Sequence, residues 1–184
     1  MLSTNQKILL ILDLDETLIH ATENDLMIDS DFDYAEYFIY KRPHLSDFLI
    51  EMNQHFQLAI WSSADDQYVH DIVEMIRPPE VVFEFVWAKS KCTLRRDYDL
   101  DQYVQEKRLK KIKKQGFRLE KALIVDDSPE KTRDNFGNAI YVLPFEGNQS
   151  DNELKILANF LKSIKDTNNV RTFEKRGWRN KKEL

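Results

Sequence analysis

Short runs of consecutive apolar residues are the strongest pattern in the chain. They cover residues 8–12, 58–61, 122–125 and 140–143, and residues 81–87 form a further, less continuous run. Each run is too short for a typical helix and lacks the alternation of a half-exposed strand. We therefore interpret them as strands that are buried on both faces of a parallel sheet.

Amphipathic or helix-favouring segments separate these strands. We expect helices over residues 43–52, 65–76, 103–115 and 152–165, and another that starts at residue 129. Pro43 and Pro129 suit first helical turns, Asp65 or Asp66 and Ser128 suit N-caps, and Gly116 suits a C-terminal stop. Alternation of strands and helices predicts an α/β domain, with a central parallel sheet flanked by helices.

Two segments depart from this alternation. From Asp13 to Glu36 the chain is acidic and has no Lys or Arg, and residues 34–40 are rich in aromatic side chains. We interpret residues 20–41 as a small hairpin or flap inserted after the first strand. We expect one domain over residues 1–166, and a basic tail over residues 167–184 that is either disordered or docked on the domain.

Composition excludes several protein classes. The chain has 184 residues, 42% of them hydrophobic and 32% charged, which is typical of a globular protein rather than a disordered one. Its net charge of −5 argues against direct nucleic-acid binding. No apolar run approaches the roughly 20 residues that span a bilayer, so we expect no membrane contact. Cys92 is the single cysteine, which fits a reducing, intracellular compartment, cytoplasmic or nuclear, and we expect a monomer.

Polar residues follow three of the predicted strands. They are Asp13 and Asp15, Ser62 and Ser63, and Asp126 and Asp127. Carboxyl ends of parallel strands meet at one edge of a sheet, where ligands bind. Any one aspartate could simply cap a turn, but several carboxylates at one edge repel each other unless a cation or protons neutralise them. Oxygen ligands with room for water favour Mg²⁺.

Four segments, in order, resemble one family. The sequence DLDETL over residues 13–18 is similar to the first motif of the haloacid-dehalogenase-like (HAD) phosphatases. Residues 14–20 more narrowly resemble its FCP/SCP branch, the NIF-type phosphatases of the RNA polymerase II C-terminal domain. Residues 41–49, 60–64 and 125–129 look like later motifs of that branch. The resemblance extends over roughly residues 7–165 and implies a Rossmann-like fold with a small flap and no large cap.

The resemblance also implies roles for single residues. Asp13 would attack phosphorus, and Asp15 would protonate the leaving oxygen and then activate water. Thr17 would orient Asp15 or support its loop, and Ser62 would donate a hydrogen bond to a phosphoryl oxygen. The ligands of Mg²⁺ would be Asp13, the backbone carbonyl of Asp15, Asp126 and Asp127. Which of the last two contacts the metal directly stays open.

The basic residues of the site are less well determined. The family uses a lysine between its second and fourth motifs to neutralise the transferring phosphoryl group. The local resemblance of residues 103–109 favours Lys107, whereas spacing alone points to Lys110. Ser63 and Arg42 are further candidates for substrate binding, although Arg42 could instead anchor the start of a helix.

The function implied by the resemblance is Mg²⁺-dependent hydrolysis of phosphomonoesters through an aspartyl-phosphate. A short insert leaves an open cleft, so we expect a phosphorylated protein or peptide as the partner, with phosphoserine or phosphothreonine as the substrate. Phosphotyrosine or a small phosphorylated metabolite is the alternative. A non-catalytic binding module on the same fold is a third hypothesis, which the complete set of acidic residues disfavours.

Overall fold

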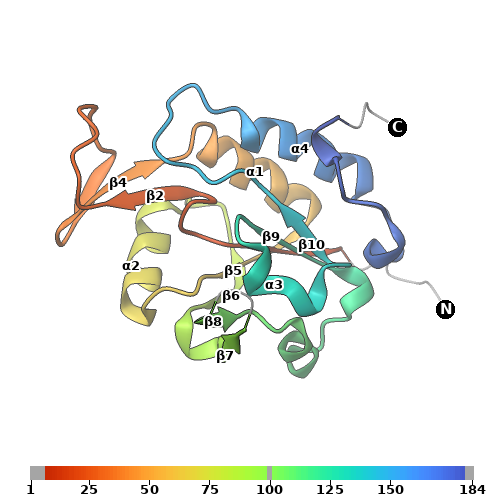
Figure 1. The fold of residues 1–184 in the computed structure, drawn as a ribbon. Helices are drawn as coiled ribbons and strands as arrows, with labels where there is room; N and C mark the ends of the chain where they lie inside the picture. Colours follow the sequence, from red (N-terminus) through yellow and green to blue (C-terminus); the bar gives the residue numbers. More distant parts are fainter. Residues whose placement is uncertain (1–6, 99–100, 181–184) are drawn as a thin grey trace.

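The computed structural model describes residues 7–98 and 101–180, and its core is a five-stranded sheet whose paired strands are all parallel (Figure 1). The strand order is β10-β9-β1-β5-β6. The strands are β1 (Leu9–Leu12), β5 (Gln57–Trp61), β6 (Phe83–Trp87), β9 (Ala122–Asp126) and β10 (Ala139–Tyr141). All five lie in or partly overlap the predicted apolar runs, so the parallel α/β fold is confirmed.

Burial explains why the central strands consist of apolar runs. Every residue of β1 and β9 is buried. Leu10 and Leu12 belong to one apolar cluster, whereas Leu9 and Ile11 belong to a second cluster on the opposite face. Successive side chains of a strand point to opposite faces, so a strand covered on both sides needs an apolar residue at every position.

Within the described residues, four α-helices accompany the sheet: α1 (Leu45–His55), α2 (Asp66–Ile76), α3 (Pro129–Thr132) and α4 (Glu153–Ile164). Helices α1 and α4 lie against each other, as Figure 1 shows. Asp65 caps α2 as predicted, because its side chain accepts a hydrogen bond from the backbone N–H of Gln67 at 3.0 Å. Pro43 does not lie in the first turn of α1, since the helix begins after His44, whose φ is 68°.

The predicted helix over residues 103–115 is wrong. Its first part is strand β8 (Gln102–Glu106), which pairs antiparallel with β7 (Thr93–Asp97). Within β8, Val104 and Glu106 are buried while Tyr103 is 68% exposed, which is the alternation of a strand. A 3₁₀ segment, Leu109–Gln115, follows and ends at Gly116, where φ is 86°. The alternation was not visible in the sequence because one of the buried positions is a charged residue. Glu106 is buried with an ion pair to Arg95 at 3.2 Å.

A three-stranded antiparallel flap follows β1. Its strands are β2 (Ile19–Thr22), β3 (Phe32–Tyr34) and β4 (Tyr37–Lys41), in the order β2-β4-β3. The flap projects away from the parallel sheet in Figure 1. A turn at Ala35, with φ of 52°, separates β3 from β4 within the aromatic-rich segment over residues 34–40.

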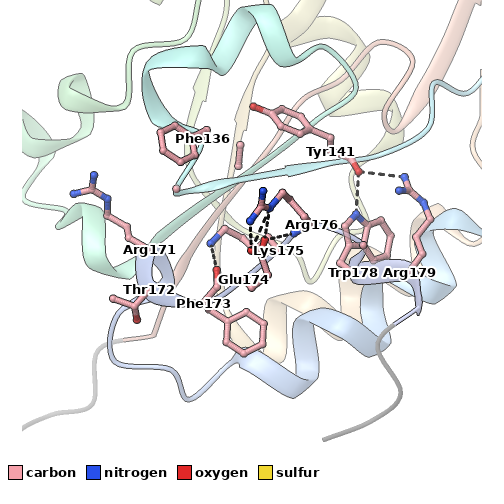
Figure 2. A pocket seen from close by; sticks show the side chains of 13 residues that line it. Phe136, Tyr141, Arg171, Thr172, Phe173, Glu174, Lys175, Arg176, Trp178 and Arg179 are labelled. Carbon is pink, nitrogen blue, oxygen red and sulfur yellow. Dashed lines mark hydrogen bonds and ion pairs between the residues drawn. The ribbon is translucent and has the colours of Figure 1, made fainter.

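The described part of the tail, residues 167–180, docks on the domain beside β10. Val170 and Trp178 are 1% and 3% exposed. The indole N–H of Trp178 donates to the carbonyl of Tyr141 at 2.9 Å (Figure 2). Within residues 7–98 and 101–180, no helix has the length and apolar character needed to cross a bilayer.

Candidate active site

The carboxyl ends of three neighbouring strands bring the predicted polar residues together. Asp13 follows β1, and its backbone N–H donates to the carbonyl of Val125 at 2.9 Å. Ser62 follows β5, and its N–H donates to the carbonyl of Trp87 at 2.9 Å. Asp126 is the last residue of β9. The site is therefore fixed by sheet hydrogen bonds rather than by mobile loops.

Three carboxylates form a cluster suited to a metal ion. Oxygen atoms of Asp13, Asp126 and Asp127 lie within 4.8 Å of one another. Asp13 Oδ2 and Asp127 Oδ1 are buried and accept no hydrogen bond from the described residues. Burial, followed by the charge of Asp13, raises the pKa of both Asp126 and Asp127. Buried oxygens without partners and an excess of negative charge fit a hard divalent cation such as Mg²⁺.

Lys107 lies inside this cluster. Its Nζ is 2.5 Å from Asp13 Oδ1 and 2.7 Å from Asp126 Oδ2, and the side chain is fully buried. Burial opposes the charge, but the carboxylates of Asp126 and Asp13 outweigh it and raise the pKa of Lys107. The ammonium therefore stays charged at neutral pH. Lys110, the alternative suggested by spacing, is exposed.

Asp15 is held by two hydroxyl groups. Tyr68 Oη donates to Asp15 Oδ1 at 2.6 Å, and Ser62 Oγ donates to Oδ2 at 3.3 Å. Burial raises the pKa of Asp15, against the opposing effect of the Tyr68 hydrogen bond. The pKa of Tyr68 is itself raised, by burial and then by the charge of Asp15, so the phenol remains a donor.

Tyr68 is the site residue that sequence reasoning missed. It lies within the helix that we predict over residues 65–76, where its spacing fits packing equally well. The available signal was its place in the first turn of α2, because that helix begins just after the carboxyl end of β5. The rings of Tyr34 and Tyr37 in the flap contact the Tyr68 ring, with centroids 5.6 and 6.4 Å away.

Thr17 and Glu16 shape the loop after β1. Thr17 is fully buried, and its Oγ1 contacts no hydrogen-bond partner among the described residues. Glu16 has a left-handed backbone, with φ of 55°, which is uncommon for a residue other than glycine. Burial, and then the charges of Asp15 and Asp127, raise the pKa of Glu16 to about 7.

Arg42 and Ser63 are not drawn into the cluster. The buried Arg42 guanidinium donates to Asp151 Oδ1 and Oδ2, both at 2.9 Å, and to the carbonyls of Leu143 and Thr17 at 2.9 and 3.1 Å. These bonds anchor the start of α1 and hold the loop that carries Thr17. Ser63 is half-buried beside Ser62, and its side chain forms no hydrogen bond within the described part of the chain.

Cys92 lies near the site but lacks the features of a nucleophile. It is half-buried against the apolar cluster that contains Trp61, and its thiol lies 3.6 Å from the carbonyl of Ser62. Burial raises the pKa of the thiol, which disfavours the reactive thiolate.

Comparison with known proteins shows the family to which this chain belongs. The model of the NLI interacting factor-like phosphatases (NIF) matches residues 8–171. CTD small phosphatase-like protein 2 of Dictyostelium discoideum is 30% identical over 175 residues, which cover 91% of this chain and 29% of that protein. Carboxy-terminal domain RNA polymerase II polypeptide A small phosphatase 1 of Homo sapiens is 26% identical over 90% of this chain and 62% of that protein.

Solved structures agree on the fold. Fission yeast Fcp1, an RNA polymerase II CTD phosphatase, was solved with beryllium fluoride bound. It aligns with a TM-score of 0.60 at 19% identity, over 86% of this chain and 47% of that one. A haloacid dehalogenase-like hydrolase from Xanthomonas campestris aligns with a TM-score of 0.56 at 10% identity, over 87% of this chain and 97% of that one.

The extent of these matches decides what they establish. The chain spans 29%, 34% and 42% of the lengths of three of the curated relatives, so the alignment covers less than half of each of those proteins. The family model covers most of this chain, and the fold is that of the HAD-like hydrolases. The chain belongs to the NLI interacting factor-like phosphatase family, the FCP/SCP type of phosphatase on the HAD fold.

Proposed function

We propose that the chain is a Mg²⁺-dependent phosphomonoester hydrolase that forms an aspartyl-phosphate on Asp13. One observation supports this most strongly. The two carboxylate oxygens of Asp13 are differentiated: Oδ1 is bound by Lys107 at 2.5 Å, whereas Oδ2 is buried without a partner among the described residues. A carboxylate whose two oxygens differ in this way can offer one oxygen to a metal ion and the other to phosphorus, each in a defined direction.

The first half-reaction follows from this arrangement. Asp13 attacks phosphorus, the bond from phosphorus to the leaving oxygen breaks, and Asp15 gives that oxygen its proton. Lys107 and the Ser62 hydroxyl stabilise charge on the phosphoryl oxygens. Bound Mg²⁺ would screen the negative charge of the phosphate, and its ligands would be Asp13, the backbone carbonyl of Asp15, Asp126 and Asp127.

The second half-reaction regenerates the enzyme. Asp15, now ionised, takes a proton from water, which attacks phosphorus and breaks the bond to Asp13. Orthophosphate leaves, and Asp15 is again protonated. The raised pKa of Asp15 suits a group that must alternate between the two protonation states.

We further propose phosphoserine or phosphothreonine in a protein as the substrate. The insert after β1 is a small flap rather than a large cap, which leaves the edge of the sheet accessible to a peptide. Human and Dictyostelium relatives are named as CTD phosphatases, which favours a protein substrate by kinship. Phosphotyrosine and small phosphorylated metabolites are the alternatives that a substrate panel would test.

Hydrolysis of an aryl phosphate tests the chemistry. Wild-type protein should turn over with Mg²⁺ and stop with EDTA, and Asp13→Asn should lower kcat by about 1,000-fold or more. Asp166→Asn, a change to an exposed acid, is the matched control. Full activity of Asp13→Asn, or indifference to EDTA, would disprove the mechanism. No turnover of any phosphomonoester would favour the binding module, and matched phosphopeptides would then distinguish serine, threonine and tyrosine.

A further inference from the structure

Lys131 lies beside the catalytic cluster in a position that the mechanism above does not use. It belongs to α3, which begins three residues after Asp126 and packs against β8. Its backbone N–H donates to the carbonyl of Ser128 at 3.1 Å, and its carbonyl accepts from the N–H of Lys107 at 2.7 Å. The two lysines are thus joined through the backbone, and the base of the Lys131 side chain is fixed relative to the site.

The ammonium group of Lys131 has no partner in the described residues. The side chain is half-buried, yet within residues 7–98 and 101–180 no carboxylate lies within 4.0 Å of it and no atom accepts a hydrogen bond from it. Lys107, by contrast, holds two carboxylates. Burial lowers the pKa of Lys131, but the charges around it, Asp13 first, raise the pKa overall. A charged, half-buried ammonium without a partner is a group that a ligand could use.

The charge of the reacting complex shows what this cation could do. A phosphomonoester dianion and the three clustered carboxylates together carry five negative charges. Mg²⁺ and Lys107 would neutralise three of them. Two of the three N–H groups of the Lys107 ammonium are already directed at Asp13 and Asp126, which leaves one for the phosphoryl oxygens. Two negative charges of the complex therefore remain for a second cation to neutralise.

We propose that Lys131 binds the phosphoryl group of the substrate as a second cation, complementing Lys107. This proposal rests on the proposed phosphatase function and deepens it. Lys131 forms and breaks no covalent bond. Its ammonium binds the phosphoryl oxygens during both half-reactions. Before a phosphate enters, the same charge repels the metal ion that the carboxylates attract. Its charge therefore acts with opposite sign on the two ligands.

The opposite signs supply the test. Lys131→Gln should weaken binding of orthophosphate and raise KM for an aryl phosphate, each by about tenfold. The same variant should bind Mg²⁺ more tightly than wild type in the absence of phosphate, measured by calorimetry. Lys131→Arg should keep phosphate binding within about threefold of wild type. Lys114→Gln, at an exposed lysine, is the matched control and should change neither affinity.

Each outcome decides the proposal. Phosphate affinity within twofold of wild type in Lys131→Gln would overturn it, and so would weaker binding of both ligands, which indicates a disturbed site. If Lys131→Gln lowers the thermal midpoint, Lys131→Met keeps the apolar stem and repeats the measurement. If the wild type hydrolyses no phosphomonoester, the proposed function fails, but calorimetry with orthophosphate and Mg²⁺ still shows whether Lys131 distinguishes the two ligands.

Discussion

The catalytic edge of the sheet and the cavity beneath the tail both gather charged side chains, but their polar atoms differ. The tail cavity has a volume of about 600 Å³ and is lined by aromatic and basic residues. Three of its cations are engaged: Lys175 donates to the carbonyls of Val170 and Phe173, Arg176 pairs with Glu174, and Arg179 pairs with Glu153. Figure 2 shows dashed lines from the Trp178 and Arg179 side chains to Tyr141.

The catalytic edge is the reverse case. Asp13 Oδ2 and Asp127 Oδ1 are buried without partners among the described residues. Buried polar atoms are nearly always hydrogen-bonded in folded proteins, so two unpartnered oxygens within one carboxylate cluster fit a site that binds a ligand. The comparison teaches that the clustering of such oxygens points to this site, whereas the volume of the tail cavity does not. It also predicts that substitutions at the two regions will affect different properties.

Among the variants that test this comparison, Lys107→Met should reduce turnover the most. It removes the charge that opposes Asp13 and Asp126, so kcat should fall by about 100-fold to 1,000-fold. It also leaves buried carboxylates unpaired, which should lower the free energy of unfolding by about 3 kcal/mol without metal. Aryl phosphate kinetics and urea unfolding measure the two effects.

Lys110→Met is the matched control for that variant. Lys110 is exposed, so both turnover and stability should stay close to wild type. Added Mg²⁺ should restore part of the stability that Lys107→Met loses, because it neutralises the same carboxylates. Loss of turnover in Lys110→Met with retention in Lys107→Met would reverse the assignment of the motif lysine.

Tyr68→Phe should have a smaller effect, about tenfold on kcat, because it removes one hydrogen bond that positions Asp15. That bond favours the charged carboxylate, so its loss should raise the pKa of Asp15 further. Asp15 donates a proton in the first half-reaction, and activity falls as pH rises through its pKa. The alkaline limb of kcat/KM should therefore move to higher pH in the variant.

Tyr34→Phe provides the comparison for Tyr68→Phe. Tyr34 Oη donates to Asp71 at 2.7 Å and does not touch Asp15. The pH profile of kcat/KM in Tyr34→Phe should therefore match that of the wild type. An unshifted alkaline limb in Tyr68→Phe, with the same loss of kcat in both variants, would show that the tyrosines act only through packing of the flap.

How much the sequence predicted depends on how local the physical cause is. Strands buried on both faces need apolar residues throughout, so β1 and β9 were evident. Strand β8 was not, because Glu106 is buried through ion pairs with Arg95 of the neighbouring strand and Arg133 of another segment. Lys107 was favoured by resemblance, and the structure places its ammonium beside Asp13 and Asp126. Tyr68 was missed because its helical spacing fits packing equally well. Its hydrogen bond to Asp15 joins α2 to the loop after β1 and exists only in the folded chain.

The tail should respond in stability and leave turnover almost unchanged. Trp178 is 3% exposed and packs near Phe160, with ring centroids 5.7 Å apart. Trp178→Ala should lower the free energy of unfolding by about 3 kcal/mol, because it leaves a cavity and removes one of the two hydrogen bonds that the carbonyl of Tyr141 accepts. Phe136→Ala, at a side chain that is 78% exposed on the same cavity, should cost less than about 0.5 kcal/mol. Urea unfolding measures the stability of both variants, and aryl phosphate kinetics measure their turnover.

A large loss of kcat in Trp178→Ala, while the protein remains folded, would mean that the tail acts on the catalytic edge and that the two regions are coupled.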